Sequence, residues 1–406
     1  MRILWLLTLL PYPPDTGGKQ DSFFMLREFA DAGDEITCGV VYQGAEPPDV
    51  PEGFARLVKE VVFLPGNPKA LHSRLLGSLG DDVPFKFRKY HSREASDILA
   101  SLLEKENGFD FLLIDHLHLA PLMLEVREHL RKKGVSVPPL VLRSPNVEST
   151  IVTKYAERVE NPLVKAFAQR ESRKVKAYEA GVLAEFDLVA AISPVDKATF
   201  EGISDRPANI ISVTAGVEVD KLRPSDEPPV DGEVVFVGTF DWQPNVDGAL
   251  WLANEVWPKV AEAYPKAHLS LVGRKPPPLI ENLAGDSIAV TGEVESVEEY
   301  VARAGCCVVP LWIGSGMRLK ILEAFALGRA VVSTSLGAEG IEIEDGGNIL
   351  IRDEPESFAK AVIDVLTKPE LRDRLGTNAR ALVERRYSWK RVAGGFRNEI
   401  LKLLGK

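Results

Sequence analysis

The sequence is poor in cysteine, with only Cys38, Cys306 and Cys307 among 406 residues. All three lie in or beside apolar stretches, and their spacing matches neither a zinc site nor a disulfide framework. We therefore expect a chain that folds without disulfide bonds or a structural metal, as is usual for proteins of the reducing cytoplasm.

Long apolar runs are also missing. No stretch approaches the ~20 consecutive apolar residues that a membrane-spanning helix requires. The first ten residues, MRILWLLTLL, resemble a secretory signal, but the run is short and no small-residue cleavage site follows it. We interpret this run as a first buried strand and expect a cytoplasmic protein, leaving open a peripheral contact with the inner face of the membrane.

Several motifs that would define other classes of protein are absent. The net charge of −10 argues against nucleic acid as the main partner. No G-x-G-x-x-G follows a predicted strand, which argues against a nicotinamide-dependent dehydrogenase, and the P-loop motif is missing. No Asp-x-Asp stands at a strand end to hold a divalent metal on a diphosphate, so we expect neither a metal nor a cofactor.

The sequence does contain two series of apolar strands that alternate with amphipathic helices. A chain of this length usually exceeds what one hydrophobic core supports. The two series are separated by a proline-rich, acidic stretch at residues 222–232, which we interpret as a linker. The pattern predicts an α/β protein with two Rossmann-like parallel-sheet domains, at residues 1–210 and 211–386, and a separate helix at 387–406.

One segment of the second half has the features of an anion site. A buried strand at residues 306–310 precedes a glycine loop and a helix expected from about Met317 to Leu327. Arg318 and Lys320 would stand in the first turn of this helix, where cations are unfavourable unless an anion is bound. Glu323 follows on the same face. These residues suit a nucleoside diphosphate, but a surface helix with a salt bridge explains them as well.

Other candidate residues also come directly after the ends of predicted strands. In open parallel sheets, ligands bind beyond the carboxyl ends of the strands. In the first half the candidates are Gly17, Gly18, Lys19, His116, His118, Asn146 and Glu148. In the second half they are Gly238, Arg274, Gly292, Glu293, Val294, Ser315, Gly316, Met317, Arg318, Lys320 and Glu323.

Several stretches together resemble a known family. They are VFVGTFDWQPNVDGALWLANEVWP, LSLVGRKPP, VTGEVESV, VVPLWIGSGMRLKILEAFALGRAVVSTSLGAEG and YSW. The chain resembles the family 4 retaining glycosyltransferases of GT-B type (glycosyl transferases group 1), especially those of polysaccharide biosynthesis. The resemblance implies that two Rossmann-like domains face each other across a cleft and that the C-terminal helix returns to the N-terminal domain. It also implies that the N-terminal domain binds the acceptor and the C-terminal domain binds the nucleotide-sugar donor.

The resemblance also assigns roles on the donor side. Glu323 matches a glutamate that binds the ribose hydroxyls, and Arg318 and Lys320 match cations that bind the diphosphate. A second glutamate of the family is replaced here by Ser315, so backbone N–H groups of residues 314–317 are expected to contact the donor sugar instead. Arg274 is a further candidate for the phosphates, Gly238 belongs to the same strand-end series, and Gly292, Glu293 and Val294 match the segment that cradles the base.

On the acceptor side, Gly17 and Gly18 match a glycine loop beside the phosphates and the acceptor, with Lys19 next to them. Asn146 and Glu148 match part of a recurrent His-Asn-Val-Glu element whose histidine is Pro145 here. A histidine often lines the catalytic cleft of the family. Because side chains alternate along a strand, His116 and His118 are not both expected to point inward. We assign His116 and Gly18 to the catalytic centre and His118 to the cleft.

These assignments predict a metal-independent retaining glycosyltransferase that moves a sugar from a nucleotide diphosphate to a hydroxyl of a glycan, glycolipid or other acceptor. Two alternatives remain: a nucleotide-sugar epimerase of the same architecture, and a non-catalytic partner that binds nucleotide sugar. The basic run at residues 165–176 would suit an anionic membrane carrying a lipid-linked acceptor. Because Glu171 interrupts that run, a solvated helix face is the alternative that we favour.

Overall fold

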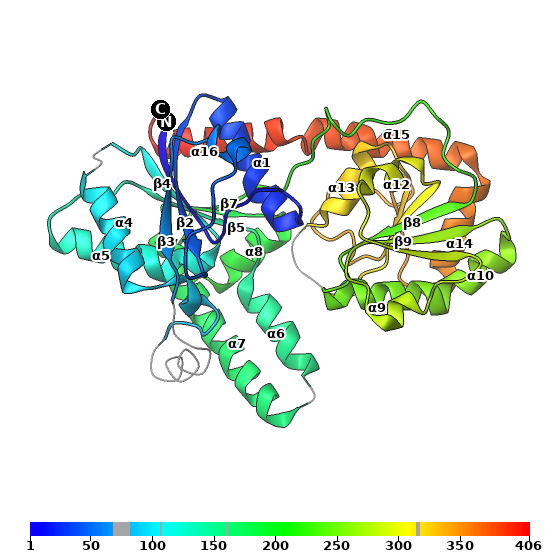
Figure 1. The fold of residues 1–406 in the computed structure, drawn as a ribbon, viewed down its shortest axis with the longest axis horizontal. Helices are drawn as coiled ribbons and strands as arrows, with labels where there is room; N and C mark the ends of the chain where they lie inside the picture. Colours follow the sequence, from blue (N-terminus) through cyan, green and yellow to red (C-terminus); the bar gives the residue numbers. More distant parts are fainter. Residues whose placement is uncertain (68–81, 106–107, 160, 314–316) are drawn as a thin grey trace. The chain divides into compact units, whose positions relative to one another are not determined.

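The computed structural model describes residues 1–67, 82–105, 108–159, 161–313 and 317–406 (Figure 1). The chain divides into two compact units. Unit 1 comprises residues 1–214 together with 393–406, and unit 2 comprises residues 215–392. Each unit is built on its own parallel sheet. No helix in the described ranges is long and apolar enough to span a bilayer.

Unit 1 contains a seven-stranded parallel sheet in the order β3-β2-β1-β4-β5-β6-β7. The strands are β1 (Arg2–Leu7), β2 (Glu35–Tyr42), β3 (Glu60–Pro65), β4 (Phe111–Asp115), β5 (Leu140–Ser144), β6 (Leu188–Ala191) and β7 (Ile210–Ser212). The strand order reverses between β1 and β4, and a crevice for ligands forms at such a point, beyond the carboxyl ends of the strands. Both central strands are almost entirely buried, as expected for a sheet covered on two faces.

Helices surround this sheet. They are α1 (Gly17–Asp31), α2 (Glu52–Ala55), α4 (Arg93–Lys105), α5 (Ala120–Lys132), α6 (Glu148–Arg158), α7 (Pro162–Val182) and α8 (Pro194–Ile203). Short 3₁₀ turns form η1 (Phe87–Tyr90), η2 (Leu117–Leu119) and η3 (Leu183–Glu185). Helices α6 and α7 form an antiparallel hairpin that projects from the body of unit 1 (Figure 1).

Unit 2 contains a six-stranded parallel sheet in the order β10-β9-β8-β11-β12-β13. The strands are β8 (Glu233–Val237), β9 (His268–Val272), β10 (Ile288–Gly292), β11 (Cys306–Val309), β12 (Val331–Ser333) and β13 (Leu350–Ile351). The helices are α9 (Gln243–Trp251), α10 (Trp257–Ala263), α11 (Pro278–Glu281), α12 (Val297–Arg303), α13 (Leu319–Ala326), α14 (Pro355–Thr367) and α15 (Pro369–Arg386). The order reverses between β8 and β11, and ligands of open parallel sheets bind at such a point.

Two helices of unit 2 differ from what the sequence predicts. The pattern of residues 246–263 predicts a single helix, but a π-helical turn, η4 (Leu252–Val256), interrupts it just before Pro258. Proline lacks a backbone N–H and its ring crowds the preceding turn, so the backbone widens there. Helix α13 begins at Leu319 rather than Met317, because Arg318 has an extended backbone (φ −93°, ψ 95°). Its end agrees with the prediction, since Gly328 has a φ of 66° just beyond the helix.

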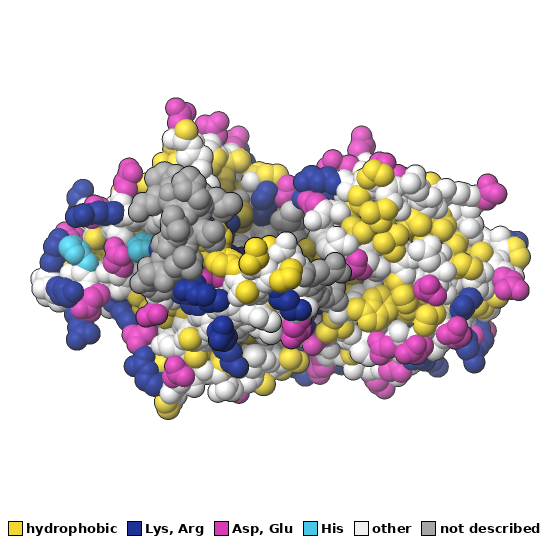
Figure 2. Space-filling model, turned by 90° about the horizontal axis from the view of Figure 1, so that it is seen from below, with side chains coloured by type: hydrophobic (Ala, Val, Ile, Leu, Met, Phe, Trp, Pro, Cys, Tyr) yellow, Lys and Arg dark blue, Asp and Glu magenta, His cyan; other side chains and the backbone are white. Residues whose placement is uncertain are grey.

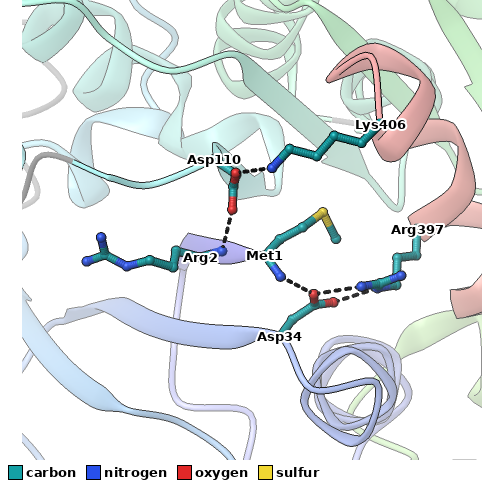
Figure 3. A network of polar contacts seen from close by, with 6 residues as sticks. All are labelled: Met1, Arg2, Asp34, Asp110, Arg397 and Lys406. Atoms are coloured by element: carbon teal, nitrogen blue, oxygen red, sulfur yellow. Dashed lines mark hydrogen bonds and ion pairs between the residues drawn. The ribbon is translucent and has the colours of Figure 1, made fainter.

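The last helix, α16 (Trp389–Leu403), begins in unit 2 and ends in unit 1. Its final turns are fixed to unit 1 by two carboxylates, shown in Figure 3. Asp34 accepts hydrogen bonds from Arg397 Nε (2.8 Å) and from the Met1 ammonium (2.6 Å). Asp110 pairs with Lys406 and accepts a hydrogen bond from the backbone N–H of Arg2. The C-terminal segment therefore returns to the N-terminal sheet, in agreement with the predicted fold class.

Candidate active site

Three adjacent strands of unit 2 end in or just before glycines, which allow the backbones of the strand ends to approach closely. Gly238 follows β8, Gly273 follows β9, and Gly292 ends β10. The N–H of Gly273 donates to the carbonyl of Gly292 (3.2 Å). A Cβ atom at Gly273 would lie 1.7 Å from the carbonyl oxygen of Gly238, so no larger residue fits there. The structure thus places Gly238 and Gly292, both predicted site residues, on one edge of the sheet.

Lys320 lies against the same edge. It is the second residue of α13, and its Nζ donates to the carbonyl of Val237 (2.5 Å) and to Oδ1 of Asn245 (3.0 Å). The ammonium also lies 5.0 Å from the centroid of the Phe236 ring. Asn245 in turn donates from Nδ2 to the carbonyl of Thr239 (2.8 Å). These contacts hold the Lys320 ammonium at the start of α13, beside the backbone that leads from Val237 to Gly238.

The charge of Lys320 depends on its burial and on the charged groups around it. Burial and the nearby Arg318 guanidinium together lower the pKa of Lys320 to about 7, against the opposing effect of Glu323. The positive end of a helix also disfavours a cation. An anion at this position would reverse the balance and favour the charged ammonium. The site therefore provides positive charge that a bound anion would stabilise.

The other residues predicted around α13 have different environments. The side chain of Arg318 is 5% exposed and immediately precedes the helix. Met317 and Glu323 are partly buried, and Glu323 lies near enough to Lys320 to influence its charge. Ser315 and Gly316 lie outside the described residues, so the predicted contact of this loop with a donor sugar is not part of the structure described.

Arg274 and the segment after β10 are the remaining candidate residues at the strand ends of unit 2. Arg274 is partly buried, and its Nε finds no hydrogen-bond partner within the described parts of the chain. Its carbonyl accepts the N–H of Phe240, which joins the loops after β8 and β9. Glu293 is exposed, whereas Val294 packs against the hydrophobic core of unit 2. The predicted donor residues thus approach one another from several strand ends, although the binding role of each stays a prediction.

Unit 1 contains a buried ionic cluster at the corresponding strand ends. Arg143, on β5, donates from Nη1 to Oδ1 of Asp115 (2.9 Å), the last residue of β4. The same guanidinium pairs with Asp21 of α1, and all three side chains are at most 6% exposed. Burial raises the pKa of Asp21, although Arg143 opposes this effect. Sequence analysis missed this cluster; its only local signal was charge at the end of two apolar strands.

The two histidines near this cluster are arranged differently from the prediction. Strand β4 ends at Asp115, and His116 has a φ of 87° before the turn η2. The argument that only one histidine points inward was wrong, because both lie beyond the strand and because residues two apart in a strand would in any case share a face. The two imidazole centroids lie 6.1 Å apart. His116 is partly exposed, whereas His118 is 7% exposed.

His118 has an aromatic and ionic environment. Its ring lies 4.8 Å from that of Phe87 and 5.4 Å from that of Tyr90, and its Nε2 is 3.5 Å from Oε2 of Glu148. Burial, with Lys86, His116 and Lys89, holds the pKa of His118 well below its usual range. His118 is therefore neutral at physiological pH, which suits packing or hydrogen bonding better than charge stabilisation.

Glu148 belongs to a second buried network. It is 3% exposed, and its Oε2 accepts a hydrogen bond from Lys86 Nζ (2.9 Å). The backbone N–H groups of Glu148 and Ser149, at the start of α6, donate to the carboxylate of Glu179 (3.0 and 3.2 Å). Burial raises the pKa of Glu179 to about 7. Asn146 is tied to the same turn, because its carbonyl accepts the hydroxyl of Ser144 (2.9 Å).

The predicted glycine loop lies at the start of α1. Gly17 and Gly18 are exposed first residues of that helix, and a Cβ atom at Gly18 would have no neighbour within 4 Å. Lys19 pairs with Asp15 (2.9 Å). The first turn of α1 contains no acidic residue, so its N–H groups remain available to an anion. Asp21 connects this helix to the buried cluster described above.

Comparisons with known proteins agree with this geometry. Residues 231–368, all in unit 2, match the family model described as glycosyl transferases group 1. An uncharacterized 44.6 kDa protein in the cps region of Klebsiella pneumoniae is 23% identical over 401 residues, covering 96% of this chain and 97% of that protein.

Two solved structures share the fold along nearly the whole chain. Sucrose-phosphate synthase from Thermosynechococcus elongatus has a TM-score of 0.74 at 17% identity and covers 100% of both chains. The HepE protein of Anabaena in complex with UDP-glucose has a TM-score of 0.67 at 13% identity, covering 99% of this chain and 100% of that one. Both likenesses show a GT-B-like fold that contains two α/β units. These comparisons identify the protein as a glycosyltransferase of GT-B-like fold, with the model of glycosyl transferases group 1 matched at residues 231–368.

Proposed function

We propose that the protein is a metal-independent, retaining glycosyltransferase of surface polysaccharide biosynthesis that acts in the cytoplasm. It would move a sugar from a nucleotide diphosphate to a hydroxyl of a glycan or glycolipid. The observation that carries the donor part of this proposal is the position of Lys320. Its ammonium lies at the N-terminus of α13 and contacts the backbone beside Gly238, within a segment that matches the family model.

The donor is proposed to bind along the strand ends of unit 2. The diphosphate would contact Lys320, Arg318 and the N–H groups at the start of α13, with Arg274 as a further cation. Glu323 would bind the ribose hydroxyls, and the segment at residues 292–294 would cradle the base. A relative of the same fold has been solved with UDP-glucose, so UDP-sugars are the first donors to test.

The chemistry follows from where charge develops. When the bond between the sugar and the diphosphate breaks, negative charge grows on the leaving oxygen. Fixed cations and helix N–H groups stabilise that charge without reorganising. Cationic side chains fill this role in the proposal, so no metal ion is required. Retention of the anomeric configuration is proposed from the family resemblance.

The acceptor is proposed to bind to unit 1. His116 is the partly exposed histidine next to the buried cluster of Asp21, Asp115 and Arg143, and Gly18 lies at the exposed start of α1. Their position at the strand ends, where the strand order reverses between β1 and β4, supports a role at the catalytic centre. The relative in a capsule (cps) region supports a polysaccharide acceptor.

A donor screen tests the proposal. Purified protein is mixed with UDP-, GDP-, ADP- and dTDP-sugars in the presence of EDTA, and thermal shift and nucleotide release are measured. We expect one donor class to bind and to release its nucleoside diphosphate slowly. Binding should be lost in Lys320→Ala and Glu323→Ala but kept in Lys266→Ala, which changes an exposed lysine of unit 2.

Three outcomes would contradict the proposal in different ways. Strict dependence on a divalent metal would refute the metal-independent mechanism. Conversion of the donor into another nucleotide sugar would indicate an epimerase. Binding without nucleotide release, whichever glycan or lipid-linked acceptor is added, would indicate a non-catalytic binding protein.

A further inference from the structure

Large apolar side chains are exposed at the outer end of the α6–α7 hairpin. Leu163 is 83% exposed, Tyr155 59% and Val164 44%. Leu163 and Val164 lie in the first turn of α7, and Tyr155 lies in the last turn of α6, so all three flank the connection between the two helices. Single exposed apolar residues are common, but a group at one projecting tip indicates an interaction surface.

The flank of the same hairpin is cationic. Residues 162–178 contain five lysines and arginines and one acidic residue, in a chain whose net charge is −10. Arg173 and Lys176 are exposed, and Lys165 is partly exposed nearer the tip. Arg173 and Lys176 are three residues apart and so share one face of α7. In Figure 2, which looks from the side toward which the hairpin projects, dark blue and yellow side chains of unit 1 lie next to one another.

The acidic residues of α7 point into unit 1 instead. Glu171 is 6% exposed, and its Oε2 accepts a hydrogen bond from the N–H of Phe85 (2.8 Å). Glu179 is fully buried against the start of α6. Glu171 therefore does not interrupt the basic surface, contrary to the interpretation of the sequence. Phe167 packs edge-on against Phe85, with ring centroids 6.2 Å apart, which fixes the helix with its cationic side outward.

We propose that the tip of the α6–α7 hairpin docks the protein on an anionic lipid bilayer. Leu163, Val164 and Tyr155 would enter the boundary between headgroups and acyl chains, while Lys165, next to Val164, lies closest to the lipid phosphates. Arg173 and Lys176, roughly 15–20 Å further along α7, add positive potential on the same side. Glu157 of α6 is the one exposed acidic residue among the described residues of the hairpin, so a tip with apolar side chains and a cationic α7 fits a soft anionic surface. A soluble anionic polymer would use the cations but not the apolar end.

This inference deepens the proposed function and rests on it, because it places unit 1, the proposed acceptor unit, where a lipid-linked acceptor would lie. Cations and apolar side chains act together in such docking. Basic residues are attracted to anionic headgroups within about one Debye length, and each buried apolar group adds to the binding. Binding should therefore require anionic lipid, weaken with salt, and depend on both kinds of side chain.

Vesicle flotation of the full chain tests the proposal. We expect the wild type to float with phosphatidylcholine vesicles that contain phosphatidylglycerol and to stay behind with pure phosphatidylcholine. Leu163→Ser/Val164→Ser and Lys165→Glu should each weaken binding by about ten-fold, and Arg173→Glu/Lys176→Glu should weaken it less, because these cations lie further from the tip. The matched controls are Val195→Ser, an exposed apolar residue of α8, and Arg131→Glu/Lys132→Glu, exposed cations of α5. Both controls should bind like the wild type.

The possible results separate this inference from the proposed function. Failure of the wild type to bind anionic vesicles, or equal loss in the controls, would overturn the docking surface. Loss only in the charge variants would also overturn it, since that result indicates a surface for anionic polymers. Donor binding and nucleotide release are measured in parallel without vesicles, and the tip variants should match the wild type there. If vesicle binding fails while nucleotide release persists, only the docking inference is wrong.

Discussion

Lys320 shows how the chemistry of one residue depends on partners that are distant in the sequence. Its contacts with Val237 and Asn245 span 83 and 75 residues. Sequence spacing indicated a cation near a helix start but gave no information on these contacts. The same applies to Arg143, whose two carboxylate partners come from α1 and β4. Residue types at strand ends could thus be predicted, whereas their pairing arises only when the strands assemble.

The lowered pKa of Lys320 predicts pH-dependent donor binding. With a folded-state pKa of about 7, the ammonium loses its proton as the pH rises through that value. Neither the diphosphate nor the base of a nucleotide sugar ionises between about pH 6 and about pH 8, so a change in this range belongs to the protein. Across that range, donor affinity should fall by up to about ten-fold. Titration calorimetry with a UDP-sugar measures it, and Lys320→Arg should remove most of the dependence. A flat profile for the wild type would show that Lys320 is not the phosphate ligand.

Asn245 is predicted to position Lys320 rather than to contact the donor. Its Oδ1 accepts from Lys320, and its Nδ2 donates to the carbonyl of Thr239. A hydrogen bond to a charged group contributes about 1.5–3 kcal/mol, so Asn245→Ala should weaken donor binding by about ten-fold. Asn245→Asp should instead shift the pH dependence upward, because a carboxylate favours the ammonium. Gln243→Ala, an exposed neighbour, is the control. An unchanged pH profile in Asn245→Asp would rule out the positioning role.

At the scale of elements, the strand expected at 306–310 is present as β11 (Cys306–Val309), since buried parallel strands read as continuous apolar runs. The π-helical turn before Pro258 and the late start of α13 were missed. Both depend on backbone geometry set by packing, which hydrophobic periodicity does not encode. The role of Glu171 was misjudged for a similar reason, because its partner is the N–H of Phe85, 86 residues away.

The start of α6 provides a test at this scale. Glu179 accepts the N–H groups of Glu148 and Ser149, yet burial raises its pKa from the ordinary 4.5 to about 7. The folded state therefore binds its proton more tightly than the unfolded state. The contribution of Glu179 to stability is largest below about pH 4.5 and is lost as the pH rises through about 7.

Glu179→Gln should remove this dependence. At about pH 8 the variant avoids a buried charge that costs up to about 3 kcal/mol, whereas at about pH 5 the wild-type side chain is already mostly neutral. The difference in melting temperature between variant and wild type should therefore grow in favour of the variant as the pH rises. Thermal unfolding at both pH values measures it, with the exposed Glu157→Gln as control. A difference that does not vary with pH would contradict a raised pKa.

At the scale of the whole molecule, the two α/β arrays were evident from the sequence, because a proline-rich segment separates two series of strands. The expected ligand positions follow from topology, since in each sheet the order reverses beside its first strand. What the pattern could not supply is how the last helix is held. Asp34 and Asp110 stand in or beside short polar turns, with nothing nearby to indicate partners more than 290 residues later.

This anchorage predicts how the end of α16 responds to one substitution. Asp34 is buried and accepts from both Arg397 and the Met1 ammonium, so Asp34→Asn leaves two cations without their counter-charge (Figure 3). Breaking a buried pair typically costs about 3–5 kcal/mol, and the partial exposure of Arg397 places this case at or below the lower figure. Hydrogen exchange should therefore show faster opening of residues 393–406. Donor binding, which is proposed to lie in unit 2, should keep the wild-type affinity. The exposed Asp31→Asn is the control, and unchanged exchange in the last helix would show that apolar packing, such as Phe396 on Phe29, holds it without the ion pairs.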